Sequence, residues 1–199
     1  MKKKLILGIA IVLAAVFLVA MLAKLSQGGE TEPTQPIGQE MQPTGAQQGP
    51  VMEDGVFTFT AHGFSNRFSG TLPEGYTLSA RAEKSADNND KLLFRLLNSG
   101  GEDTKIAVLL NVLESEEAFS QLALVAQADC KAEDFSALLR WYVSGFMTGL
   151  SETEAQEVYD AFLQQFSQQK AEQKTFAHPE HTAVMLKSAQ QYYVLVTVH

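Results

Sequence analysis

Nineteen consecutive apolar residues near the N-terminus constrain this chain more than any other feature of its sequence. The run extends from Leu5 to Ala23 and is bounded on each side by lysine. A helix rises about 1.5 Å per residue, so this segment would reach roughly 28 Å, close to the hydrocarbon thickness of a bilayer. The sequence therefore predicts an N-terminal transmembrane anchor or signal helix over residues 1–25.

The details of this segment favour a retained anchor over a cleaved signal peptide. A cleavable signal usually has a shorter apolar region of about 7–15 residues, followed by a small-x-small cleavage site. Cleavage after Ala23 would put Met21 at the −3 position, and cleavage after Ala20 would put Leu18 there. Most of the flanking positive charge precedes the segment, which predicts a cytoplasmic N-terminus. We expect a single-pass protein of the cell membrane with an extracytoplasmic C-terminal domain; secretion after cleavage is the alternative.

Residues 26–55 form a second region, rich in Gln, Gly, Pro and Thr. Four of the six prolines of the chain lie here, and the apolar residues are few and scattered. Such a stretch cannot bury enough apolar surface to offset the entropy of ordering it. We expect a disordered, semi-extended linker that tethers a folded domain of residues 56–199 to the membrane.

The domain of residues 56–199 is predicted to be α+β, with a mostly antiparallel sheet of about six strands. Period-2 apolar patterns and short apolar runs predict the strands, which we place at residues 76–83, 91–97, 104–113, 119–128, 181–187 and 192–198. The segment 119–128 also fits a helix, but that helix would continue without a break into the next one. The spacing of apolar side chains predicts a short amphipathic helix over residues 61–71. Residues 56–60 are either a strand before this helix or part of one element that runs on into it.

Two longer amphipathic helices are predicted over 132–148 and 152–169. Gly149 suits the left-handed turn that ends many helices. Ser151 and Glu154 have the spacing of a capping box, in which each side chain bonds the other residue's backbone N–H. Strands with period 2 bury one face, so we expect the helix pair to pack on that face.

The composition of the chain and the absence of certain motifs argue against several classes of function. The formal net charge of −8 argues against nucleic acid as a partner. Cys130 is the single cysteine, so the chain cannot form an internal disulfide, and we expect a semi-buried free thiol. Phosphate-binding loops and the G-x-S-x-G nucleophile elbow do not occur. We therefore expect no cofactor and lean against an enzyme.

The segment "HPEH" contains the strongest candidates for metal binding. Imidazole and carboxylate groups are common zinc ligands, which makes His178, Glu180 and His181 a candidate set. Pro179 keeps the segment out of a regular helix, so the spacing of the two histidines fixes no ligand geometry. The simpler interpretation is a polar loop before a strand. A metal-dependent extracytoplasmic hydrolase remains the alternative function.

Four aromatic residues are candidates for binding a partner. Trp141 and Tyr142 are adjacent on a helix, so both cannot face the centre of the core equally. We expect one of them, with Tyr192 or Tyr193 of the last strand, to be partly exposed and available to a partner. Anchor, linker and compact domain together predict a binding or interaction module at the cell envelope, attached to the membrane through residues 5–23 and facing a protein or another envelope component.

Overall fold

A computed structural model describes residues 51–59, 61–79, 83–84, 91–111 and 121–199. The chain divides into two units, residues 1–42 and 43–199, and all of the described residues belong to the second. The predicted anchor over 1–25 and the predicted linker up to residue 50 lie outside the described residues. Among the residues that are described, no helix combines the length and apolarity needed to cross a bilayer.

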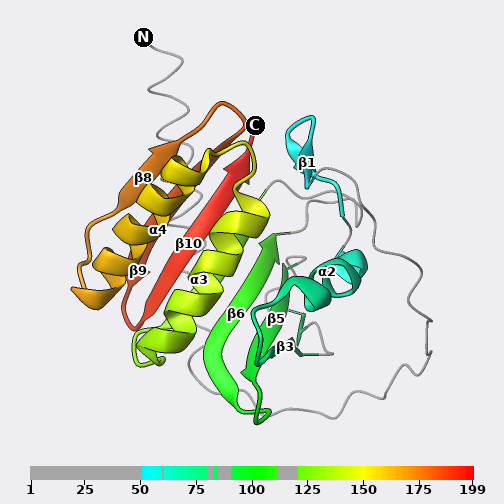
Figure 1. The fold of residues 1–199 in the computed structure, drawn as a ribbon, viewed down its shortest axis with the longest axis vertical. Helices are drawn as coiled ribbons and strands as arrows, with labels where there is room; N and C mark the ends of the chain where they lie inside the picture. Colours follow the sequence, from blue (N-terminus) through cyan, green and yellow to red (C-terminus); the bar gives the residue numbers. More distant parts are fainter. Residues whose placement is uncertain (1–50, 60, 80–82, 85–90, 112–120) are drawn as a thin grey trace. The chain divides into compact units, whose positions relative to one another are not determined.

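The domain is α+β and centres on one antiparallel sheet, as the sequence predicts (Figure 1). From edge to edge the strand order is β3-β5-β6-β7-β10-β9-β8, and each neighbouring pair is antiparallel. The strands are β3 (Tyr76–Leu78), β5 (Lys91–Asn98), β6 (Asp103–Asn111), β7 (Gln121–Gln127), β8 (Lys174–Ala177), β9 (His181–Ser188) and β10 (Gln191–Val198). A separate two-stranded hairpin pairs β1 (Met52–Glu53) with β2 (Val56–Phe57).

Most strand predictions are confirmed, and the differences lie at the two edges of the sheet. Residues 121–127 are a strand, which resolves the ambiguity of that segment. The predicted strand 76–83 is divided into β3 and β4 (Glu83–Lys84), both of which pair with β5. Strand β8 was not predicted, because "KTFA" has only one half-buried apolar side chain, Phe176. Its pairing with β9 determines its conformation, which local sequence does not encode.

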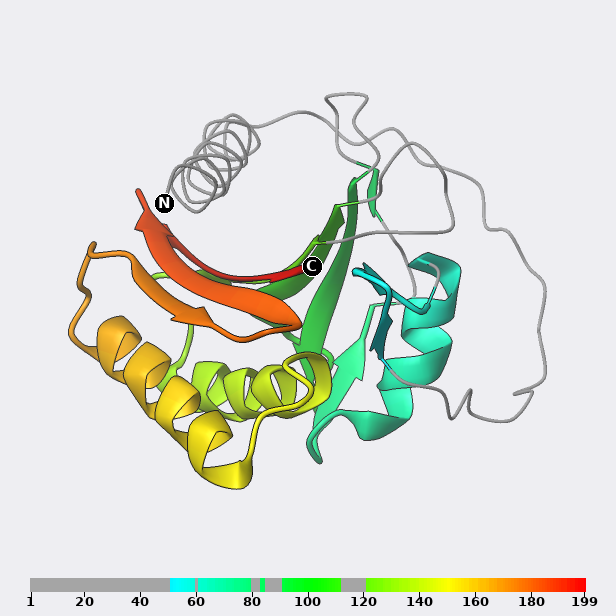
Figure 2. The ribbon, with the colours of Figure 1, turned by 90° about the horizontal axis from the view of Figure 1, so that it is seen from above.

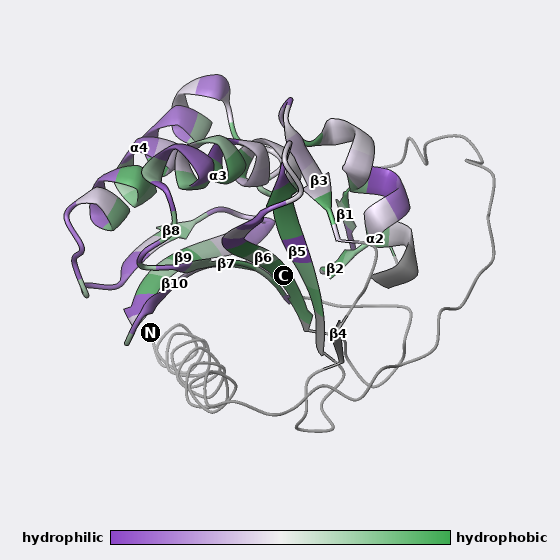
Figure 3. Ribbon diagram, turned by 90° about the horizontal axis from the view of Figure 1, so that it is seen from below, coloured by the Kyte–Doolittle hydropathy of each residue, from purple (hydrophilic) through white to green (hydrophobic). Residues whose placement is uncertain are grey.

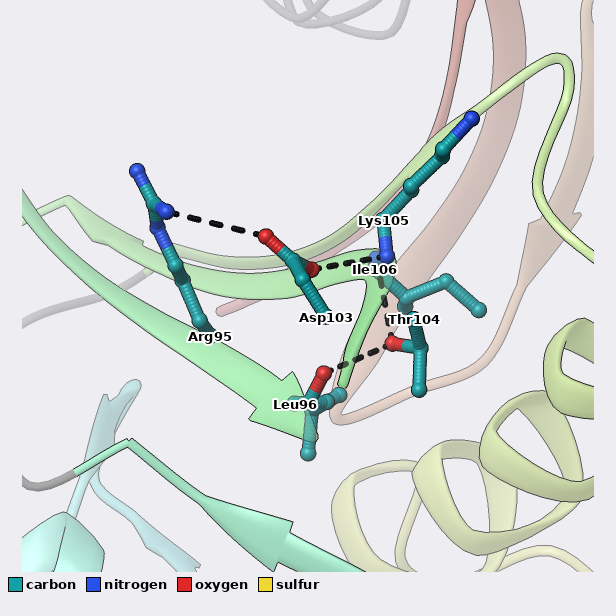
Figure 4. Close-up of polar contacts among 6 residues, drawn as sticks. All are labelled: Arg95, Leu96, Asp103, Thr104, Lys105 and Ile106. Atoms are coloured by element: carbon teal, nitrogen blue, oxygen red, sulfur yellow. Dashed lines mark hydrogen bonds and ion pairs between the residues drawn. The ribbon is translucent and has the colours of Figure 1, made fainter. Parts of the chain in front are cut away.

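A bulge interrupts the pairing of β5 with β6 near their connecting turn (Figure 4). Thr104 and Lys105 stand between the paired residues Asp103 and Ile106, and Lys105 has a left-handed φ of 62°. The Thr104 hydroxyl donates to the Leu96 carbonyl at 2.8 Å and accepts from the Ile106 N–H at 3.2 Å. The side chain thus replaces ladder hydrogen bonds that the bulge removes.

Within the described part of the chain, three α-helices accompany the sheet: α2 (Ala61–Phe68), α3 (Ala132–Phe146) and α4 (Glu152–Ser167). Helices α3 and α4 cover one face together, as Figures 1 and 2 show. Tyr142 of α3 donates to the Leu122 carbonyl of β7 at 2.6 Å, and Phe135 of α3 stacks on Phe166 of α4. The capping box at Ser151 and Glu154 is confirmed. Both long helices end two residues before their predicted ends.

Helix α2 and the 3-10 turn after it, η1 (Ser69–Thr71), extend the core beside β5. Phe64 contacts Phe94 of β5 and Phe146 of α3, with ring centroids 4.8 and 5.9 Å apart. The aromatic cluster explains why a helix with Gly63 inside it still forms: packing against the core outweighs the low helix propensity of glycine.

Both faces of the sheet are apolar, whereas the strand pattern predicted one buried face. Six side chains turned away from α3 and α4 are also only 1–8% exposed: Leu109, Ala123, Val125, Val184, Tyr193 and Leu195. Four of them are cross-strand partners in one row over β6, β7, β10 and β9. Figure 3 shows these strands as apolar, and the sheet is concave on the side away from the helices. Near-continuous apolar runs such as "LALVA" are typical of strands buried on both faces.

Candidate functional site

A pocket of about 200 Å³ lies where α4 begins, between the α3–α4 loop and the β8–β9 hairpin. Its apolar wall comes from two separate stretches of the chain, the α3–α4 loop with the start of α4 and the β8–β9 hairpin: Met147, Leu150, Val158, Phe176, Ala177 and Ala183. Its polar lining consists of two carboxylates and two imidazoles: Glu154, Glu157, His178 and His181. Two of the three residues predicted as metal ligands therefore line one pocket.

The turn between β8 and β9 places the two histidines side by side. The His178 N–H donates to the His181 carbonyl at 2.9 Å, which closes the hairpin around Pro179 and Glu180. The Glu180 N–H donates to Nδ1 of His178 at 3.3 Å. As a result, the two imidazole centroids are 4.8 Å apart and their planes are inclined by 34°. Pro179 helps here because it favours a turn and lacks the N–H that a continued strand would need.

His181 is the most unusual polar group of the pocket, because its side chain is only 2% exposed. Its Nδ1 has no hydrogen-bond partner among the described residues. Burial, and to a lesser degree the nearby His178 and His199, lower the pKa of His181 to about 4. The imidazole is therefore neutral near pH 7, with one ring nitrogen that donates a hydrogen bond and one that accepts.

Gly149 allows the α3–α4 loop to approach the hairpin closely. Its φ of +83° lies in the left-handed region, and a Cβ there would be 2.8 Å from Cε1 of His178 and 3.1 Å from Oε2 of Glu180. Glycine is thus required both by the backbone conformation and by the neighbouring side chains. The sequence predicted the left-handed turn, but it gave no sign of the contact with His178.

The carboxylates occupy the first two turns of α4, at the rim of the pocket. Glu154 accepts from the Ser151 N–H at 2.8 Å and from the Ser151 hydroxyl at 2.6 Å. These hydrogen bonds, and to a lesser degree the charge of His178, lower the pKa of Glu154. Glu157 is exposed one turn further along the helix. None of the ten residues that line the pocket is a lysine or an arginine.

The geometry does not assemble the predicted metal site. Glu180 is exposed and does not line the pocket, although His178 and His181 both do. Over the described part of the chain, no three His, Cys, Asp or Glu side chains are grouped so that they could hold a metal ion.

All four aromatic candidates for partner binding are buried, so the expected partial exposure is wrong. Tyr142, Tyr192, Tyr193 and Trp141 are 0, 1, 2 and 7% exposed, respectively. Trp141 is covered because η1 lies beside α3, and its Nε1 donates to the Thr71 hydroxyl at 3.1 Å. The sheet covers Tyr142 on the neighbouring side of the same helix. Periodicity within α3 could not reveal this second cover, because η1 comes from a distant part of the sequence.

Sequence reasoning missed the apolar wall and Glu157 of the pocket. Met147, Leu150 and Phe176 come from a loop and an edge strand, where no periodic pattern indicates a shared surface. The only signal was the pair of histidines around a proline. No protein-family model, curated protein or solved structure matches this chain. The site must therefore be interpreted from its own chemistry.

Proposed function

We propose that this chain is a membrane-anchored, exported binding module whose ligand site is the pocket at His178 and His181. Residues 5–23 would hold it in the cell membrane with the N-terminus in the cytoplasm. Residues 26–55 would give the domain its reach toward a protein or another envelope component. The apolar run, its flanking lysines and the composition of the linker support this arrangement.

One observation carries the ligand site: His181 is nearly fully buried and lines the pocket, and its Nδ1 has no hydrogen-bond partner in the part of the chain that the structure describes. Leaving a buried polar group unsatisfied costs about 1–3 kcal/mol, so such groups often belong to a binding site. A ligand that bonds to His181 would remove that cost. The volume of about 200 Å³ suits a ring-sized molecule, since an apolar cavity of about 150 Å³ in another protein holds benzene.

A fragment screen on the full chain in detergent micelles tests this proposal. We expect small molecules that bind the pocket to shift the imidazole C–H resonances of His178 and His181 in NMR spectra. Leu150→Trp should abolish these shifts, because the larger side chain fills the pocket from its rim. Leu163→Trp is the matched control, since Leu163 is also half-buried but does not line the pocket. Shifts that persist in Leu150→Trp, or the absence of any hit, would refute the site.

A further inference from the structure

We infer that the ligand of this pocket is a small organic cation, namely a protonated nitrogen on an apolar body of about the size of one ring. The inference rests on the proposed function and specifies its ligand. Three features of the pocket lead to it: the sign of the charges, the hydrogen-bonding state of His181, and the character of the wall.

The charges around the pocket favour a positive ligand. Glu154 and Glu157 line it, and no lysine or arginine is among the lining residues. Opposite charges a few ångströms apart attract even near a protein surface. The net charge of −8 adds a long-range attraction for cations.

The N-terminus of α4 does not reverse this preference. A helix start carries a partial positive charge that normally favours anions. Here Ser151 accepts a hydrogen bond from the Glu154 N–H, and the Glu154 carboxylate bonds back to Ser151. The capping box thus satisfies two of the backbone N–H groups at the helix start and places a full negative charge there.

His181 supplies the acceptor that a protonated amine requires. A neutral imidazole has one nitrogen with an in-plane lone pair that can accept a hydrogen bond. Nδ1 of His181 is buried and has no partner among the described residues, so it would be this acceptor in the tautomer that has its proton on Nε2. An N–H of a bound ammonium group would complete that hydrogen bond, and charge-assisted hydrogen bonds are the stronger kind. An anionic ligand would lie beside two carboxylates and would gain no opposite charge at His181, because burial opposes protonation of this imidazole.

The wall of the pocket suits the apolar body of such a ligand. Val158 and Met147 are nearly fully buried and offer aliphatic surface, while Phe176 of β8 offers an aromatic ring. Phe176 is held in place by edge-to-face contact with Phe162, with centroids 5.3 Å apart. A cation close to the face of an aromatic ring gains additional electrostatic attraction.

Three probes of equal size and different charge test the inference: benzylamine, benzyl alcohol and benzoate. Each is titrated into the full chain in nonionic micelles at neutral pH by calorimetry, with empty micelles as the reference. We expect benzylamine to bind at least about tenfold more tightly than benzyl alcohol, and benzoate not to bind. Glu157→Gln should weaken benzylamine about three- to tenfold and leave benzyl alcohol unchanged. Glu133→Gln, the same charge change at the start of α3, should alter neither.

The outcomes of these titrations test the charge of the ligand separately from the existence of the binding site. Tighter binding of benzyl alcohol or benzoate, abolished by Leu150→Trp, would overturn the cationic ligand and leave the proposed binding site intact. Binding of benzylamine that does not respond to Glu157→Gln would also overturn the inference, because the carboxylate would then contribute nothing. If none of the three probes binds, the cationic ligand is refuted, and the fragment screen decides separately whether the pocket binds ligands at all.

Discussion

His181 makes the stability of the folded domain depend on pH. Its pKa is about 4 in the folded state, against 6.5 for an unperturbed histidine, so the unfolded chain binds the proton more readily. The stabilisation is therefore complete above about pH 6.5 and is lost as the pH falls toward about 4. The full effect is on the order of 3 kcal/mol.

Urea unfolding at about pH 7 and about pH 4.5 measures this effect. We expect the free energy of unfolding to fall by less in His181→Gln than in the unmodified chain, because the variant lacks the titrating imidazole. Other groups titrate in both proteins, so only the difference between the two slopes is attributed to His181. Equal slopes would show that the buried imidazole does not couple to folding.

The stability of the domain also depends on Gly149, both through its left-handed backbone conformation and through its close packing against His178. Gly149→Ala should lower the free energy of unfolding by about 1–3 kcal/mol, since alanine is strained at φ +83° and its Cβ would press on His178. Thermal unfolding of the single variants and of Gly149→Ala with His178→Ala separates the two causes. In the double variant, the loss of stability caused by the steric contact should disappear, whereas the loss caused by the strained backbone should remain. If the losses of stability in the two single variants simply add up in the double variant, the contact between Gly149 and His178 is contradicted.

The elements of this domain owe their stability to packing on both sides of the sheet. Strands β6, β7 and β10 have apolar side chains on both faces, and those on the concave face are as buried as those under the helices. In a strand with alternating polar and apolar residues, substitutions on the polar face would change stability little. In these strands, truncation of an apolar side chain should lower stability on either face.

Leu195→Ala tests this property of β10. Leu195 points away from the helices and is 3% exposed, so its truncation should cost about 2–5 kcal/mol, as expected for a core leucine. Leu186→Ala on β9 is the matched control, because Leu186 is on the same face but only half-buried. Denaturant unfolding of both variants is the measurement. A loss below about 0.5 kcal/mol for Leu195→Ala would mean that this face behaves as ordinary surface.

The whole molecule is expected to stay attached to the membrane through residues 5–23. Expression of the full chain with a C-terminal tag, followed by cell fractionation and N-terminal sequencing, tests that expectation. We predict a membrane-bound protein with an intact N-terminus, because the apolar run is long and its cleavage sites are poor. A new N-terminus near Lys24, with the protein in the medium, would contradict the anchor and favour the secreted form.

Local features of the sequence determined much of this fold. The capping box at Ser151, the helix pair and the strands within 91–127 and 181–198 were predictable, because each depends on periodicity or on contacts three or four residues apart. The histidine pair was also visible, since two imidazoles around a proline are adjacent in sequence. The break in the first strand and the short strand β8 were not, because edge strands take their conformation from the strand beside them.

The sequence by itself determined the α+β class, the boundaries of the two long helices to within two residues and the apolar N-terminal run, because these depend on local periodicity and composition. Only the tertiary structure decided the strand order, the burial of Trp141 beneath η1, and the meeting of Leu150, Glu157 and Phe176 with His181 around one pocket. The physical reason is separation along the chain: these side chains approach one another only after distant elements pack, and the sequence pattern of each element is independent of its eventual neighbour.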